Sequence, residues 1–141
     1  MSKEIIYSAP ELVEVSFRHD LKPVVLKWFS EYDEGTGVKD AVFAALDYVR
    51  QHDVKHWLAD LSTSRRGLTP TDQEWVGSDE FRNAIVKSPL RKFVLIPPSP
   101  ETGQDVGWLA EWEANTLAKF GEDVEAKLSS DLDGIRSFFV G

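Results

Sequence analysis

The sequence predicts an α/β fold: antiparallel strands at the N-terminus are followed by alternating strands and helices (βαβαβα), and helices cover one mixed sheet. Apolar and polar residues alternate over much of the first thirty positions, as they do in strands with one buried face. Later apolar runs are short and nearly continuous, which is typical of buried parallel strands, and helical patterns separate them. No internal repeat or Gly/Ser-rich linker divides residues 1–141, so we expect a single domain.

Three N-terminal strands are expected over residues 5–7, 12–17 and 24–29. The second and third strands each turn alternate apolar side chains to one face, and these side chains are Val13, Val15 and Phe17, then Val24, Leu26 and Trp28. Short connections that contain Pro10 and Pro23 favour antiparallel neighbours.

The first helix is expected to begin at Thr36 or Gly37, either of which suits the N-cap position. Its apolar residues recur at about 100° per residue and form one face: Val38, Ala41, Val42, Ala45 and Val49.

Residues 55–61 and 92–96 are expected to be neighbouring parallel strands, because both are compact and apolar and helical patterns separate them. Thr69 and Pro70 predict a helix start, since a hydroxyl cap precedes proline at the first helical position. Gly77 and Ser78 then predict a break before a second short helix over residues 79–86, which ends before Pro89.

The C-terminal part predicts a helix over residues 105–120, a strand over residues 124–128 and a last helix from Asp131. Ser130 is the expected N-cap of the last helix. The side chains expected to be buried on that helix are Leu132, Ile135 and one of Phe138 and Phe139.

The chain is acidic and contains no cysteine. Sixteen Lys and Arg against twenty-four Asp and Glu give a net charge of −8, which argues against nucleic acid or an anionic membrane as the main partner. The absence of cysteine excludes disulfides and thiolate nucleophiles and fits a reducing cytoplasm. The longest apolar run, from Ala41 to Leu46, is far shorter than the about 20 residues of a membrane-spanning helix, and no secretion signal precedes the first strand. We therefore expect a cytoplasmic protein without membrane insertion.

Three segments, together with the order of elements, resemble the SpoIIAA-like, STAS-like small bacterial proteins, most of all the Bacteroidetes-type STAS/SEC14 domain-containing proteins. The segments are His56–Leu61, Leu68–Trp75 and Ser129–Asp133. The resemblance covers roughly residues 5–140 and implies a four-layered β/α superhelical fold with a non-enzymatic regulatory or interaction role.

In anti-sigma-factor antagonists of the STAS group, a stretch Asp-Ser-Ser-Gly-Leu at a helix start carries a phosphorylated serine. Its nearest counterpart here is Ser64–Leu68, in which Arg65 and Arg66 stand between serine and glycine. Asp60 matches the acidic position that precedes the loop in the family.

The loop of residues 62–67 is the first candidate site, because ligands and partners favour the carboxyl ends of parallel strands. Ser62, Thr63 and Ser64 are candidate phosphoacceptors, and a phosphate there could pair with Arg65 and Arg66. The same arginines suit a small anion site, and a purely structural polar turn is the third interpretation.

No catalytic, cofactor or metal site is predicted. The phosphate-loop pattern GxxxxGK[ST] is absent. His52 and His56 are four residues apart, but a change from helix to strand falls between them, so this spacing does not predict metal ligands.

Trp108 and Trp112 are the second candidate site. They form a stripe beside the apolar face of the helix expected over residues 105–120. This stripe could pack within the fold, line an apolar pocket, or contact a partner protein or a second copy of the chain.

These expectations combine into a protein-interaction or regulatory module of the STAS-like type. The alternative is a module that binds a small molecule or lipid in an apolar pocket near Trp108 and Trp112. An enzyme is the least favoured class, because no nucleophile, metal cluster or cofactor loop occurs at a recognisable spacing.

Overall fold

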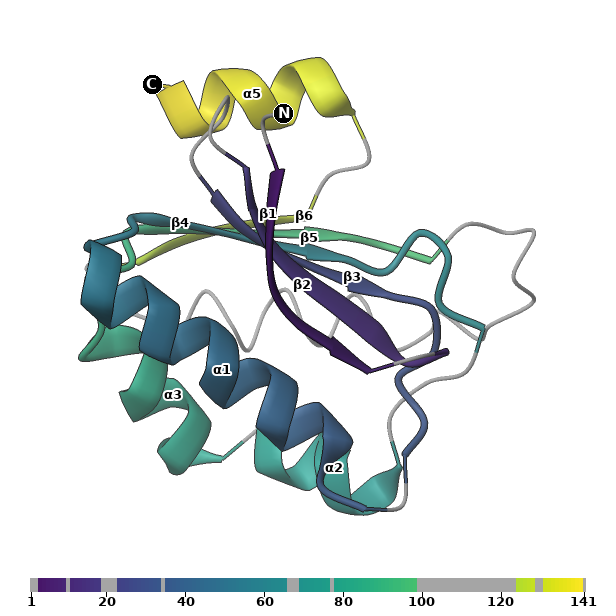
Figure 1. Cartoon of the computed structure of the whole chain (residues 1–141). Coiled ribbons are helices and arrows are strands. Elements are labelled where there is room, and N and C mark those ends of the chain that lie inside the picture. The colour runs from purple at the N-terminus through teal and green to yellow at the C-terminus, as the bar shows by residue number, and fades with distance from the viewer. Residues whose placement is uncertain are drawn as a thin grey trace.

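The computed structural model describes residues 3–9, 11–18, 23–33, 35–65, 69–76, 78–98, 124–128 and 131–140. Strands and helices alternate in the order expected from the sequence (Figure 1). The elements are β1 (Lys3–Ala9), β2 (Val13–Arg18), β3 (Pro23–Trp28), α1 (Gly37–His52), β4 (His56–Asp60), α2 (Pro70–Val76), α3 (Asp79–Val86), β5 (Lys92–Ile96), β6 (Glu125–Leu128) and α5 (Leu132–Val140).

The six strands form one mixed sheet in the order β1-β2-β3-β4-β5-β6. β1, β2 and β3 pair antiparallel, and β3 to β6 pair parallel. The prediction that β4 and β5 are parallel neighbours is confirmed, since His56 pairs with Lys92 and Asp60 with Ile96. The carboxyl ends of β3 and β4 therefore lie side by side at one edge of the molecule.

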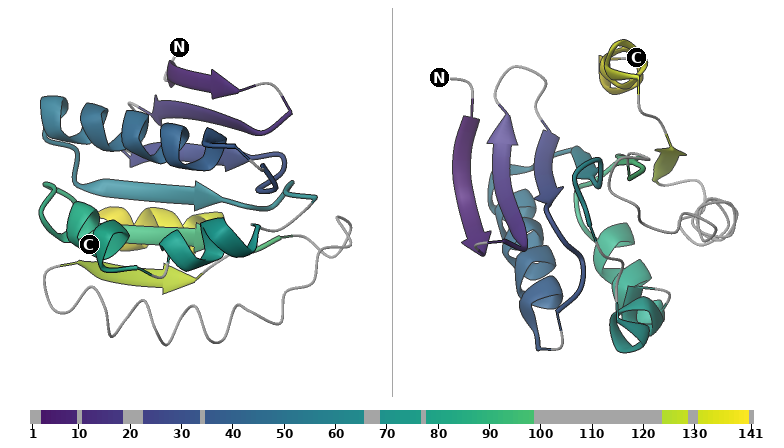
Figure 2. Two further views of the ribbon diagram at one scale, coloured as in Figure 1. Left: turned by 90° about the horizontal axis from the view of Figure 1, so that it is seen from below. Right: turned by 90° about the vertical axis from the view of Figure 1, so that its right-hand side faces the viewer.

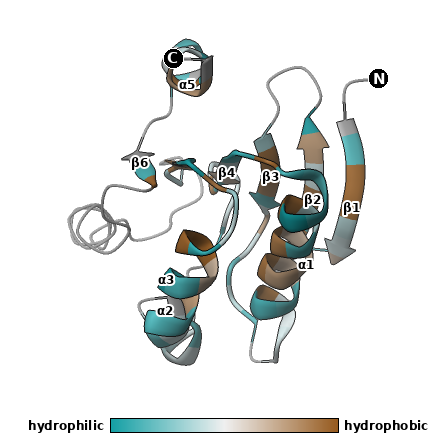
Figure 3. Ribbon diagram, turned by 90° about the vertical axis from the view of Figure 1, so that its left-hand side faces the viewer, coloured by the Kyte–Doolittle hydropathy of each residue, from teal (hydrophilic) through white to brown (hydrophobic). Residues whose placement is uncertain are grey.

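Helices cover both faces of this sheet. α1, α2 and α3 lie on one face, and α5 lies on the other (Figures 1 and 2). Apolar residues recur along β1 to β3 and on the turns of α1 and α3 (Figure 3). None of the described helices combines the length and the apolar content that a membrane span needs.

The larger apolar cluster lies between the sheet and α1 to α3, and it contains the faces that periodicity predicted. Val13, Val24, Leu26, Val38 and Trp57 are among its buried members. The smaller cluster joins α5 to the opposite face and consists of Val25, Leu58, Val94, Ile96, Ile135 and Phe139, with Phe138 packed against it.

The helix starts were predicted with mixed success. Thr69 Oγ1 accepts a hydrogen bond from the Asp72 amide at 3.1 Å, as expected. α3 begins directly after Ser78, as the predicted break requires, and Ser78 is its N-cap, a role that the sequence did not predict. Thr36 is the N-cap residue of α1, but its side chain makes no capping hydrogen bond; Asp33 Oδ2 instead accepts from the Gly37 amide at 2.8 Å.

The start of α5 corrects one prediction about its cap. Asp131 supplies the carbonyl that accepts from the Ile135 amide at 2.9 Å, and its Oδ1 accepts from the Asp133 amide at 3.1 Å. Asp131 therefore takes the N-cap role that the sequence suggested for Ser130, which lies outside the described residues. A carboxylate suits this position because it also faces the positive end of the helix dipole.

Candidate functional site

The loop after β4 is held by its own polar side chains. Asp60, the last residue of β4, accepts at Oδ1 from the amide of Ser62 at 2.9 Å and from its hydroxyl at 2.6 Å. This side-chain turn redirects the chain immediately at the end of the strand.

Hydrogen bonds also tie the loop to the strands on both sides of β4. The Leu61 amide donates to the Ile96 carbonyl at the end of β5 at 2.9 Å. Thr63 Oγ1 donates to the Trp28 carbonyl at the end of β3 at 3.0 Å, and the Arg65 amide donates to the Phe29 carbonyl at 3.0 Å. The backbone of residues 61–65 therefore has a defined position over the edge of the sheet.

Ser64 lies beneath this loop rather than on its surface. Its exposed fraction is 0%, and its hydroxyl donates to Oε2 of Glu31 at 2.7 Å. Glu31 is itself only 5% exposed. The hydrogen bond from Ser64 offsets part of the desolvation cost of the buried Glu31 carboxylate. It also joins the loop after β4 to the segment after β3.

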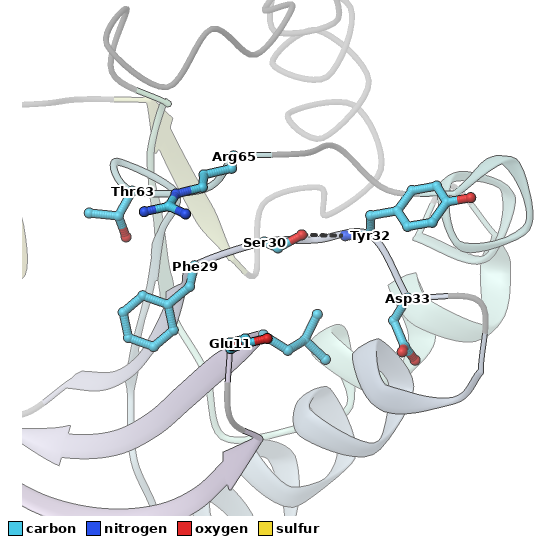
Figure 4. Close-up of a pocket in the computed structure, with 8 residues that line it drawn as sticks. Glu11, Phe29, Ser30, Tyr32, Asp33, Thr63 and Arg65 are labelled. Atoms are coloured by element: carbon cyan, nitrogen blue, oxygen red, sulfur yellow. Dashed lines mark hydrogen bonds between the residues drawn. The ribbon is translucent and has the colours of Figure 1, made fainter.

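An open pocket lies beside the loop, at the carboxyl ends of β3 and β4 (Figure 4). Three segments line it: the β1–β2 turn, the chain after β3 and the loop after β4. Its lining residues are Glu11, Leu12, Phe29, Ser30, Tyr32, Asp33, Thr63 and Arg65. Phe29 is 36% exposed, so part of its ring is accessible at this pocket.

Glu11 has an uncommon backbone conformation at this pocket. Its φ is 65°, in a turn closed by a hydrogen bond from the Leu12 amide to the Ala9 carbonyl at 3.0 Å. Glycine or asparagine is the usual residue at such a position, because a β-carbon is strained there. The turn therefore carries a glutamate side chain at a free-energy cost.

The structure places part of the first predicted site at this edge of the sheet. Asp60, Ser62, Ser64 and Arg65 all belong to the loop over this edge, but with different roles. Asp60 and Ser62 shape the turn, Thr63 and Arg65 are exposed, and Ser64 is buried. The burial of Ser64 does not suit an acceptor that a kinase must reach.

The remaining predicted site residues lie outside the described residues. They are Arg66, Trp108 and Trp112. The two histidines at positions 52 and 56 are described and have separate surroundings: the ring of His52 packs at a tilt against Tyr48, and the ring of His56 stacks on Phe139. Within the described ranges, no three His, Cys, Asp or Glu side chains gather as metal ligands.

Sequence reasoning missed Glu11, Phe29, Glu31 and Tyr32. For Glu31, Phe29 and Tyr32 no pattern was available, because they follow β3 in an irregular segment whose partners come from other parts of the chain. Glu11 did have a weak signal, since Pro10 before it favours a turn. Comparison of the chain with protein-family models, curated proteins and solved structures finds no match, so the site is interpreted from its own residues.

Proposed function

We propose that this chain is a non-enzymatic regulatory or protein-interaction module of the SpoIIAA/STAS-like type, located in the cytoplasm. We further propose that it contacts its partner through the loop after β4 and the pocket beside that loop. The α/β order with a mixed sheet supports the fold assignment, and the absence of cysteine supports the compartment.

The observation that carries the proposal is the tethering of residues 61–65. Side-chain and backbone hydrogen bonds fix this loop to β3 and β5, while Thr63 and Arg65 remain exposed beside the exposed ring of Phe29. A loop that is already ordered loses little conformational entropy when a partner binds. Arginine and aromatic side chains, as in Arg65, Phe29 and Tyr32, also supply much of the binding energy of protein interfaces.

The acidic net charge of −8 supports a protein rather than a nucleic acid as the partner. A second copy of this chain is one candidate partner. The alternative function, binding of a small apolar molecule near Trp108 and Trp112, concerns residues outside the described part of the chain and stays a prediction.

A photo-cross-linking residue at position 63, introduced in native cells, tests this function. Gln51 provides the control position, because it is exposed at the opposite end of α1 from the pocket. We expect one defined adduct from position 63, none of the same mass from position 51, and a weaker adduct when Arg65→Glu is combined with position 63. A homodimer would give twice the monomer mass. Identical adducts from both positions, or none, would contradict the proposal.

A further inference from the structure

We propose that the pocket beside Glu11 receives a basic side chain, lysine or arginine, of the partner protein. This inference rests on the proposed function for the class of partner, and it adds the chemistry that the pocket selects. Glu11 is the group that would pair with the cation, and Phe29, on the same side of the pocket in Figure 4, would contact its alkyl stem.

One carboxylate of the pocket lining is open to a cation, although Arg65 and Lys27, whose Nζ lies 5.7 Å from the centre of the Phe29 ring, offset the negative charge of the lining. Two of its residues, Glu11 and Asp33, carry carboxylates, and one, Arg65, carries a guanidinium. The Asp33 carboxylate already accepts from the Gly37 amide at the start of α1. Within the part of the chain that the structure describes, the Glu11 carboxylate makes no hydrogen bond or ion pair, so it is available to a ligand.

The ring of Phe29 also suits a basic side chain. Aromatic rings attract cations through their negative faces, and the stems of lysine and arginine pack well on apolar surface. Phe29 already does so within this molecule, because Nζ of Lys27 lies 5.7 Å from the centre of its ring. Its exposure of 36% leaves further ring surface open to the pocket.

The strained conformation of Glu11 supports the same conclusion. A glycine would adopt the φ of 65° without strain, but it would have no carboxylate at the edge of the pocket. Strained residues persist only where the surrounding structure holds them, and they cluster at binding and catalytic sites. Binding of a cation is the function that an unpaired carboxylate at a pocket most directly provides.

The position of Arg65 determines at which end of the pocket a cation can bind. In Figure 4, Arg65 and Glu11 lie on opposite sides of the segment that contains Phe29, Ser30 and Tyr32. Arg65 repels a basic group on its own side, so the cation is expected on the Glu11 side. The overall charge of −8 attracts basic partners from solution.

Amide chemical shifts of the full-length labelled chain test this inference during titration with small probes. The basic probes are the α-acetylated amides of lysine and arginine, in which only the side chain is charged. The matched probes are the corresponding amides of norleucine, which lacks the charge, and of glutamate, which reverses it. Two variants are compared, Glu11→Gln at the pocket and Glu74→Gln on the exposed side of α2, because both remove one negative charge.

We expect saturable shifts at Leu12, Phe29 and Ser30 with the basic probes. Glu11→Gln should weaken their binding roughly fivefold, and Glu74→Gln should leave it unchanged. Equal binding of norleucine amide, tighter binding of glutamate amide, unchanged binding in Glu11→Gln, or no saturable shift at all would each overturn the inference.

This experiment can fail independently of the proposed function. If a partner cross-links at position 63 but places no basic residue at the pocket, the proposed function is supported and the inference of a lysine or arginine in the pocket is wrong. Binding of the basic probes without any cross-linked partner would support the cation site and contradict the proposed interaction through position 63.

Discussion

Ser64 donates a 2.7 Å hydrogen bond to Glu31, and this buried contact connects two loops that are 33 residues apart in the sequence. Glu31 follows β3 and Ser64 follows β4, so the bond joins the carboxyl ends of two neighbouring parallel strands. The exposed residues of the candidate site, Thr63 and Arg65, flank Ser64 directly. The conformation of the site therefore depends on a contact beneath it.

Replacement of Ser64 by alanine should destabilise the protein. The change removes a buried hydrogen bond to a carboxylate and leaves Glu31 with less compensation, which costs about 1–3 kcal/mol of the free energy of unfolding. Ser62→Ala is the matched control, since the Ser62 backbone amide still donates to Asp60 and the site is less buried; we expect a loss under about 1 kcal/mol. Urea denaturation measures both losses, and equal losses would show that the Ser64 contact has no special role.

Replacement of Glu11 by glycine should stabilise the protein while it weakens the proposed binding. The φ of 65° is unstrained for glycine, so relief of strain should add about 0.5–1 kcal/mol to the free energy of unfolding, partly offset by the greater entropy of glycine in the unfolded chain. Glu11→Ala is the control, because it removes the same carboxylate and keeps the β-carbon. Urea denaturation should place glycine above alanine, and the reverse order would contradict the argument from strain.

Much of the fold could be predicted because its signals are local. The five apolar residues expected on one face of α1 are all buried, and the cap at Thr69 lies where the hydroxyl and proline pattern placed it. The second short helix, α3, covers the predicted residues 79–86. Strand bounds were less accurate. β1 runs from Lys3 to Ala9 rather than over residues 5–7. It pairs with β2 from Lys3 to Ala9, apart from a register shift between Ile5 and Tyr7, and this backbone pairing does not require apolar side chains.

The candidate site was predictable only in its position. Strand ends can be read from local pattern, and they placed residues 60–65 at the carboxyl edge of the sheet. The partners of these residues could not be read in the same way. Glu31 and Ser64 are both polar, so a sequence places them on the surface, and only the close approach of two loops buries them together.

Phe139 should control how firmly α5 is held on the sheet. It is 4% exposed, stacks on His56 with ring centres 4.6 Å apart, and belongs to the small cluster that joins α5 to its face of the sheet. Phe139→Ala should remove about 3–5 kcal/mol of packing, and a short helix on a small cluster should then open locally. Hydrogen exchange should show faster exchange of α5 amides with α1 amides less affected.

Ser137→Ala is the control for this change, because Ser137 is exposed on the same helix. It should leave α5 protection unaltered. Uniform loss of protection across α1 and α5 in Phe139→Ala would show instead that α5 unfolds only together with the rest of the chain.

Tyr48 should make the protein less stable in alkaline solution. Burial raises the pKa of Tyr48 above its usual value of 10.0, and the hydrogen bond to Glu4 and the charge of Glu4 raise the pKa further. A group whose pKa is higher in the folded state binds its proton more tightly there, so its stabilisation is complete below 10.0 and is lost as the pH rises through the folded value. Tyr48→Phe should therefore show a smaller loss of stability in this alkaline range than the parent protein.

Glu4→Gln should lower the pKa of Tyr48. The titration of Tyr48 is followed as the difference in tyrosinate absorbance between chains with and without Tyr48. Glu74→Gln is the control, because it removes one negative charge from α2, and it should leave the pKa of Tyr48 unchanged. If Glu74→Gln lowers this pKa as much as Glu4→Gln does, the cause is the net charge and not the 3.1 Å hydrogen bond between Tyr48 and Glu4.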